Sequence, residues 1–432
     1  MKKVSILLLC VLLPLFPIGA KKKARNSEIP ILAWYSIPGG KYATVEHYQE
    51  LKDCGFTYSF AHIYKYEDAI QALDLCAKVG LKSIFMCPEL EKEPEEIVRK
   101  VMNHPGLGGY FLRDEPGNNA MDDLGEWARR IQKVDPQHPC YLNLLPVHGL
   151  PEGTYGEHLR LFDEKVPLPQ LSYDHYPVNV NEKGDTYLNP FFYQNLEMVS
   201  AEGKRVGKPF WAFALSTAHG SYPIPTIDHL RLQMYSNLAY GAQLLQYFTY
   251  WNPGTETWDF HQAPVTQQGL RSTVYDLVRE FNQEIQRRAF VWKDCRMESV
   301  YHLGENIPKG TTLLTTLPQH FRQLSLNKGS ILVSTLVNGD KHYVQIVNTS
   351  PAHPAQFQLL TDDEVKLVRR DATMQKASLY ESLHILAPGD TEIYTTRCLL
   401  IINKILHVYE NQDFPFPSSV DGDFSDDSSG LQ

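Results

Sequence analysis

The hydrophobic and polar positions between residues 31 and 251 follow two alternating patterns. Short runs rich in apolar, aromatic and β-branched residues are each followed by a polar loop. A segment then follows in which apolar residues recur every three or four positions. Such runs predict buried strands, and the wider spacing predicts amphipathic helices. The eight runs are residues 31–38, 56–64, 82–89, 109–116, 139–146, 169–177, 208–220 and 242–251.

The segments between the runs complete a repeating strand–helix unit. Glycines such as Gly55, Gly80 and Gly207 precede the next run, as expected where a helix ends. Eight alternating units close into a (β/α)8 TIM barrel, which we predict over residues 27–293. An open doubly wound sheet is the alternative, but the loop after the first run lacks a GxGxxG phosphate turn. Helical stripes are formed by Val45, Tyr48 and Leu51, by Ile70, Leu73 and Ala77, and by Leu270, Val274, Leu277, Val278, Phe281 and Ile285.

The pattern changes to short strands after about residue 294. Asn338-Gly339 lies between two alternating runs, residues 331–339 and 340–350, and indicates a tight hairpin. Further short runs follow at 355–360 and 377–396, so a small antiparallel β-sandwich is predicted over residues 294–410. The stretch 397–410 fits a strand or a helix. Residues 411–432 are rich in Pro, Ser and Asp and predict a disordered acidic tail.

The first 20 residues have the pattern of an export signal. Two lysines precede an apolar stretch at 4–16 that is short for a membrane span, and small residues follow at 17–20. We therefore expect a signal peptide at 1–20 and export to the periplasm, the cell surface or the medium, with no membrane span in the mature chain. An uncleaved anchor is the alternative. The cysteines are scattered without a CxxC pair, and Cys54, Cys76 and Cys87 are expected to be buried thiols.

Composition narrows the class of partner. The net charge of −9 argues against nucleic acid, because phosphate binding needs a basic face. Aromatic residues make up 11% of the chain, which suits either stacking on a flat ligand or a large aromatic core.

Candidate site residues gather at the predicted strand ends. In a TIM barrel the carboxyl ends of the strands carry the chemistry, and the fourth run ends in Arg113, Asp114 and Glu115. Carboxylates among aromatic rings are what the hydrolysis of a glycosidic bond requires. The other candidates at or just after strand ends are Trp34, Tyr35, His62, Tyr64, Glu89, Asn143, Asp174, His175, Tyr176, Trp211, His219, Trp251 and Glu256.

Three stretches carry a resemblance to a known family. "GYFLRDEP" (109–116), "LSYDHYP" (171–177) and "APVTQQGLRSTVYDLVREFNQEIQ" (263–286) resemble the clan-A glycoside hydrolases over roughly residues 30–290. The nearest resemblance is to family-42-like, β-galactosidase-like proteins and related secreted proteins of gut Bacteroidetes, in which a sandwich also follows the barrel.

The resemblance implies that Glu115 is the acid/base residue, and it implies no metal or cofactor. Asp114 stands where the clan has Asn, whose contact with the sugar 2-hydroxyl is therefore in question. The clan's nucleophile, a Glu that ends strand seven, has no counterpart in residues 208–220. Asp174, Glu256 and Glu89 are the candidates for the second carboxylate.

Two functions follow from these residues. The first is an exported glycoside hydrolase that acts on an oligo- or polysaccharide by a two-carboxylate mechanism. The second is a non-catalytic carbohydrate-binding protein on the same barrel. A metal-dependent hydrolase would require His62, His175 and His219 to converge.

Individual candidates also have structural interpretations. Arg113 and Asp114 could form a plain salt bridge, Asp174 and His175 could cap a loop, and Glu89 could begin a solvated helix. The tryptophans Trp34, Trp211 and Trp251 could pack within the barrel.

Overall fold

The structure is a computed structural model that describes residues 28–377 and 382–397. The predicted signal peptide and acidic tail lie outside these residues. So does the undecided stretch 397–410, except that the backbone of Arg397 ends the last strand.

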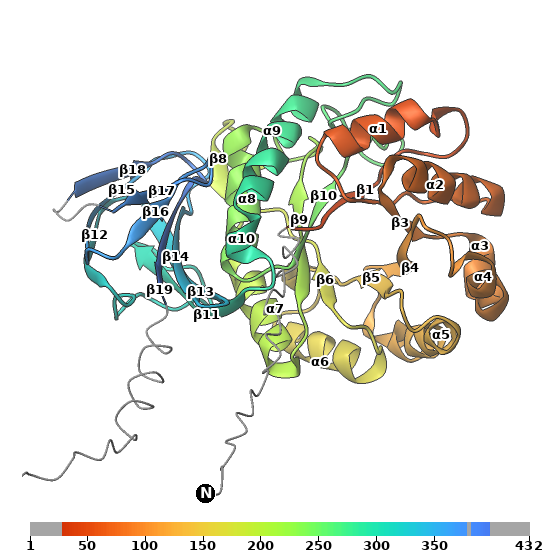
Figure 1. The fold of residues 1–432 in the computed structure, drawn as a ribbon, viewed down its shortest axis with the longest axis horizontal. Coiled ribbons are helices and arrows are strands. Elements are labelled where there is room, and N and C mark those ends of the chain that lie inside the picture. Colours follow the sequence, from red (N-terminus) through yellow and green to blue (C-terminus); the bar gives the residue numbers. More distant parts are fainter. Residues whose placement is uncertain (1–27, 378–381, 398–432) are drawn as a thin grey trace, which may run out of the picture.

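Eight parallel strands form the barrel, one from each predicted run (Figure 1). Their order in the sheet is β5-β4-β3-β2-β1-β10-β9-β6. A bridge between Leu144 and Tyr173 joins the two ends of this sheet, and the Leu144 amide donates to the Ser172 carbonyl at 2.7 Å. The predicted TIM barrel is therefore confirmed. The strands are β1 (Ile31–Trp34), β2 (Tyr58–Ser59), β3 (Lys82–Phe85), β4 (Leu107–Asp114), β5 (Cys140–Asn143), β6 (Leu171–Tyr173), β9 (Phe210–Leu215) and β10 (Leu244–Phe248).

Helices surround the barrel on its outer side (Figure 1). Gly80 and Gly207 end α2 and α7 in the left-handed conformation, with φ of 78° and 70°, as the sequence predicted. The last stripe is corrected at Leu270, which is 66% exposed because α9 begins only after the capping side chain of Ser272. The helices are α1 (Val45–Asp53), α2 (Tyr66–Val79), α3 (Pro88–Lys92), α4 (Pro94–Val101), α5 (Met121–Val134), α6 (Tyr155–Lys165), α7 (Phe192–Val206), α8 (Ile227–Ala239), α9 (Thr273–Arg287) and α10 (Ala289–Trp292).

Alternation along the strands separates two apolar cores. In β4, Tyr110 and Leu112 face the helices, whereas Phe111 faces the barrel interior. Aromatic side chains including Trp34, Phe60, Tyr141 and Phe213 fill that interior. Much of the aromatic content therefore serves packing. Cys54, Cys76 and Cys87 are buried free thiols, as expected.

Short strands and 3-10 turns complete the barrel half. Strands β7 (Val178–Val180) and β8 (Thr186–Leu188) pair as a hairpin after β6. The 3-10 turns are Gly40–Tyr42, Asn118–Ala120 and Val147–Gly149. Among the described residues no helix has the length and apolarity needed to cross a membrane.

Two antiparallel sheets follow α10 and form the predicted sandwich. One sheet has the order β11-β13-β14-β19-β16-β17 and the other β12-β15-β18. Asn338 pairs with Lys341 around a two-residue turn, which confirms the hairpin. The strands are β11 (Arg296–Gly304), β12 (Phe321–Lys328), β13 (Ser330–Asn338), β14 (Lys341–Asn348), β15 (Ala355–Thr361), β16 (Lys366–Val368), β17 (Met374–Lys376), β18 (Ser382–Leu386) and β19 (Thr391–Arg397).

Strand β13 of the larger sheet is buried on both faces. In β13, Ile331 and Val333 belong to the core between the two sheets, whereas Leu332 and Leu336 join the core of the barrel. Strands β13 and β14 contact α8, beside which the sandwich lies in Figure 1. The Ser334 hydroxyl donates to the carbonyl oxygen at the end of α8, at 2.6 Å. The sandwich is thus packed firmly against the barrel.

Candidate active site

The end of β4 turns neighbouring charged side chains in different directions. The register between β4 and β5 shifts between Phe111 and Asp114. Arg113 points to the helix side and pairs with Glu91 of α3 at 3.3 Å. Asp114 instead accepts from the Asn143 side chain of β5 at 3.3 Å. A register irregularity of this kind re-aims side chains next to a site.

Glu115 has an unusual backbone conformation. Its φ is 44°, in the left-handed region that non-glycine residues rarely adopt. The Glu115 amide donates to the Asn143 carbonyl at 2.8 Å, which holds the chain in place just beyond the strand. Such strain is retained where the surroundings determine the conformation, and it is common at functional sites.

Three carboxyl groups meet at this end of the barrel, and we call Asp114, Glu115 and Asp174 the carboxyl cluster. The Asn143 amide nitrogen donates to Asp174 at 2.8 Å and to Asp114 at 3.3 Å. The Glu115 carboxyl is hydrogen-bonded to that of Asp174, which follows β6. Because a carboxylate has no donor, a hydrogen bond between two carboxyl groups requires a proton on one of them.

Burial and mutual repulsion keep that proton in place. Desolvation, followed by the charge of Asp174, raises the pKa of Asp114 to about 7. Desolvation, followed by the charges of Asp174 and Asp114, raises the pKa of Glu115 to about 8. Desolvation also raises the pKa of Asp174, against hydrogen bonds from Asn143 and Tyr176. Asp114 and Glu115 are nonetheless open to solvent, so the cluster offers an accessible acid at neutral pH.

Aromatic rings from β1 and β2 form one side of the site. The Trp34 ring lies 5.0 Å from the His62 ring and 6.2 Å from that of Tyr35, which has a φ of 54°. Desolvation lowers the pKa of His62 and raises that of Tyr35. Tyr64, whose charge also raises the pKa of Tyr35, is 71% exposed.

A second set of rings continues around the barrel end. Tyr176 stacks on Phe248 with centroids 5.9 Å apart, and Phe248 lies 5.8 Å from Phe260. His219 lies 4.5 Å from Phe260 and 6.5 Å from Trp258. Trp258 is 58% exposed. Phe248, Phe260 and Trp258 were not among the site residues predicted from the sequence. For Trp258 the available signal was its position beside Glu256 in the loop after the eighth strand.

Of the three candidates for the second carboxylate, Asp174 interacts with Glu115. Glu256 and Glu89 lie elsewhere. Glu256 is exposed in the loop after β10, where its charge helps to raise the pKa of Tyr35. Glu89 lies in α3 beside Cys87, with one buried carboxylate oxygen that has no protein partner. After β9 the chain continues into Ser216 and Thr217, both fully buried, and no carboxylate occurs in residues 210–220.

Three candidates lie away from the carboxyl cluster. Trp211 is near the start of β9, where it packs against the aromatic interior of the barrel. Trp251 is 3% exposed and packs against His47 of α1 at 5.2 Å. His175 is 2% exposed, with its ring nitrogen 3.0 Å from the Asn195 side-chain oxygen of α7. These side chains pack against the helix layer or the barrel interior.

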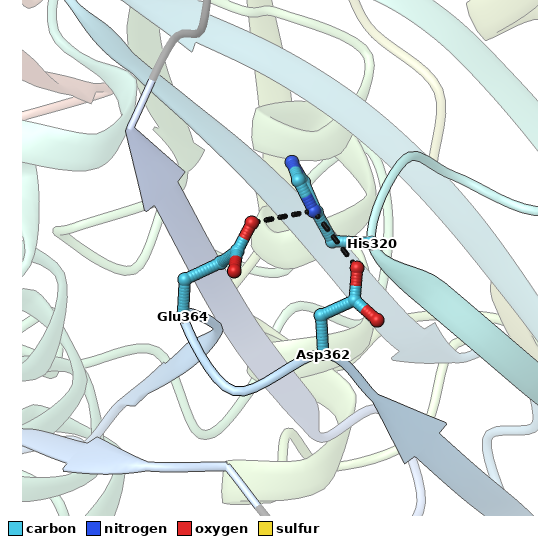
Figure 2. Close-up of side chains that lie close together, drawn as sticks. All are labelled: His320, Asp362 and Glu364. Atoms are coloured by element: carbon cyan, nitrogen blue, oxygen red, sulfur yellow. Dashed lines mark hydrogen bonds and ion pairs between the residues drawn. The ribbon is translucent and has the colours of Figure 1, made fainter. Parts of the chain in front are cut away.

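The three barrel histidines do not form a metal-ligand group. Among the described residues, one set of side chains brings ligand atoms together in that way, namely His320, Asp362 and Glu364 of the sandwich (Figure 2). The His320 ring nitrogen lies 3.1 Å from Asp362 and 2.9 Å from Glu364. Asp362 also pairs with Arg322, which already supplies a positive charge to this group, and we assign no metal there.

Comparisons with known proteins agree with this architecture. The model of glycoside hydrolase family 42, described as beta-galactosidase, matches residues 123–288. The beta-galactosidase from Bacillus circulans sp. alkalophilus has a TM-score of 0.56 at 9% identity, with 86% of this chain and 99% of that chain covered. For Gan42B, a GH42 beta-galactosidase from G. stearothermophilus, the TM-score is 0.55 at 9% identity, with coverage of 86% and 98%. The chain therefore has a fold like that of GH42 glycoside hydrolases.

Other comparisons are more limited. The beta-galactosidase from the psychrophilic Marinomonas ef1 has a TM-score of 0.48 at 12% identity, and the alignment covers 60% of this chain. This chain spans 60% of the length of that protein. No curated protein matches the sequence.

Proposed function

We propose that the protein is a glycoside hydrolase that cleaves O-glycosidic bonds of an oligo- or polysaccharide, with Glu115 as the proton donor. The observation that carries this proposal is the position of Glu115 just past the carboxyl end of β4, beside Asp114 and Asp174, where burial and these two charges raise its pKa to about 8. A general acid works best when its pKa is near the operating pH, because it is then protonated and still able to release the proton.

The contact between Glu115 and Asp174 determines which catalytic role each carboxyl group can take. Catalytic carboxyl pairs flank the sugar and lie about 5–5.5 Å apart in retaining enzymes and roughly 6.5–9.5 Å apart in inverting enzymes. The Glu115 and Asp174 carboxyl groups are joined by a hydrogen bond, so a sugar ring cannot lie between them. We therefore assign to Asp174 the role of sharing and restoring the proton of Glu115.

A water-activating carboxylate must then come from another element. Glu256 is our candidate, because it is exposed in the loop after β10 and acts on Tyr35 at the same end of the barrel. The exposed rings of Tyr64 and Trp258 offer flat surfaces for the apolar faces of sugar rings. The beta-galactosidases with a similar fold make β-galactosides the first substrates to test.

Replacement of the proposed acid tests the assignment. We expect Glu115→Gln to lower the hydrolysis rate by about 10²- to 10⁴-fold, because the amide cannot donate the proton to the leaving oxygen. The measurement is turnover of a series of aryl glycosides and oligosaccharides, together with sugar affinity, which is expected to persist. Glu197→Gln is the matched control, since Glu197 also has a pKa raised by burial but lies on α7 and bonds Tyr240. Undiminished turnover in Glu115→Gln would refute the assignment.

The second candidate function is capture of a carbohydrate without hydrolysis. It is favoured by the absence of a carboxylate after β9, where Ser216 and Thr217 stand. It predicts affinity for oligosaccharides with no new reducing ends after long incubation. Release of reducing ends that depends on Glu115 would exclude this function.

We also propose that the protein is exported, on the pattern of its first 20 residues. Cell fractionation combined with N-terminal sequencing tests this proposal. A full-length chain retained in the cytosol would contradict it.

A further inference from the structure

A series of buried polar side chains crosses the aromatic interior of the barrel and ends at the carboxyl cluster. The Tyr141 hydroxyl donates to the Gln246 side-chain oxygen at 2.6 Å. The Gln246 amide nitrogen donates to the Ser172 hydroxyl at 2.8 Å, and that hydroxyl donates to the Asn143 side-chain oxygen at 3.1 Å. We call these four residues the Gln246 relay. None of them is more than 2% exposed.

The relay has one direction. Ser172 already accepts from Gln246, so the Asn143 oxygen is the acceptor for the Ser172 hydroxyl hydrogen. A reversed Asn143 amide would set its nitrogen against Ser172 and its oxygen against Asp174. A buried donor or acceptor left without a partner destabilises a protein by about 1–3 kcal/mol. The relay therefore keeps the Asn143 nitrogen on the side of the carboxyl cluster.

The orientation of Asn143 distinguishes the three carboxyl groups. Its amide nitrogen donates to Asp114 and Asp174, and these bonds lower the pKa of both against the effect of burial. Glu115 receives no such bond, and each of the influences on its pKa raises it. Negative charge is thus favoured on the two aspartates and the proton on Glu115.

The neighbours of the cluster are weak competitors for this proton. The other titratable groups whose pKa is affected by Asp174 are Tyr141, Tyr155, Tyr173, Tyr176, Tyr222 and His148. Burial raises the pKa of these tyrosines and lowers that of His148, so all of them are uncharged near neutral pH.

We propose that Gln246 and Ser172 are positioning residues, which hold the Asn143 amide nitrogen against Asp114 and Asp174 and so leave Glu115 as the protonated carboxyl group. This inference rests on the proposed role of Glu115 as the acid. It adds a pathway by which a residue of β10, deep in the barrel, sets the protonation of a residue at the end of β4.

The test is a titration of the unliganded protein, which needs no substrate. Isotope-edited infrared spectra of protein with labelled aspartate follow the ionisation of Asp114 and Asp174, with Asp114→Asn and Asp174→Asn used to assign the bands. In Ser172→Ala the Asn143 amide loses its fixed orientation and can accept a hydrogen bond from a protonated aspartate. We expect the aspartate ionisation to move up by about one pH unit.

Two further variants and a control complete the experiment. Gln246→Met removes the donor to Ser172 and is expected to shift the titration in the same direction, whereas Ser172→Thr keeps the hydroxyl and is expected to restore it. Ser334→Ala removes an equally buried serine hydroxyl in β13 and is expected to leave the titration unchanged. Unchanged aspartate titration in folded Ser172→Ala and Gln246→Met would overturn the proposal. If the shift occurs but no glycoside is hydrolysed, the relay stands and the proposed function fails.

Discussion

At the scale of single residues, the surroundings of the carboxyl cluster disfavour the ionised form of its carboxyl groups. Asp114 and Glu115 have raised pKa values because burial and neighbouring carboxylates disfavour ionisation. Such a group binds a proton more tightly in the folded chain than in the unfolded chain. For Glu115 this contribution to stability is therefore fully present below the unfolded pKa of about 4.3 and is lost as the pH rises through the folded value.

This linkage predicts how stability depends on pH. Glu115→Gln is expected to have the same melting temperature as the parent near pH 4, where Glu115 is protonated, and a higher one at pH 9. The parent loses the stability contributed by protonated Glu115 as the pH rises from about 4.3 to about 8. Thermal unfolding of both proteins across this range is the measurement.

A control of opposite sign is available on the surface. The hydrogen bond and charge of Arg130 lower the pKa of Glu95 to about 2, so its contribution is present above the unfolded pKa and is lost as the pH falls. Glu95→Gln is expected to lower the melting temperature at neutral pH and to leave it unchanged in acid. If Glu115→Gln instead lost stability relative to the parent at pH 9, the raised pKa of Glu115 would be wrong.

At the scale of elements, close contacts between helices decide where glycine is required. A Cβ atom at Gly125 of α5 would lie 2.1 Å from the Lys165 carbonyl oxygen at the end of α6. At Gly156 of α6 the nearest atom would be 3.8 Å away, in Met198. The missing side chain of Gly125 therefore allows α5 and α6 to approach closely, whereas the position of Gly156 has room for a methyl group.

A pair of alanine substitutions tests this difference. Gly125→Ala is expected to lower the free energy of unfolding by about 1–3 kcal/mol, because the helices must separate. Gly156→Ala is expected to raise it by a few tenths up to about 1 kcal/mol, because alanine favours the helix. Urea denaturation measures both. Equal effects of the two substitutions would contradict the close contact between α5 and α6.

At the scale of the whole molecule, the sandwich and the barrel share a buried surface. A Cβ atom at Gly389 would lie 2.4 Å from the Asp228 carbonyl oxygen and 2.5 Å from the Leu232 amide nitrogen of α8. Gly339, at the hairpin turn between β13 and β14, has a similar φ of 64° but no atom within 4 Å of such a Cβ. The two glycines differ in their contact with the barrel and not in backbone conformation.

Substitution of these glycines measures the docking of the two parts. Both alanine variants pay for the left-handed conformation, and Gly389→Ala is expected to lose about 1–3 kcal/mol more, because its methyl group pushes the sandwich from α8. Calorimetric unfolding compares the two variants. A loss in Gly339→Ala as large as that in Gly389→Ala would show that the contact with α8 contributes nothing.

The sequence by itself determined the order of the elements and the class of the fold. Hydrophobic spacing along the chain is a local property, so the runs of eight strands, the helical stripes and the Asn338-Gly339 hairpin were all visible in it. The position of Glu115 just after an apolar strand also singled it out, because parallel strands present their carboxyl ends at one end of a barrel.

Only the tertiary structure decided which side chains meet. The register shift between β4 and β5 separates Arg113 from Asp114, and the positive φ of Glu115 sets its direction. The contacts of Asn143 and Asp174 come from other strands. Trp251 follows the end of β10 as the site residues follow other strands, yet it packs against α1, and Trp211 lies near the start of β9. Trp258 is exposed in a loop. Strand register, strand-end geometry and the path of the loops depend on contacts with residues distant in the chain. The local pattern of residues therefore cannot predict them.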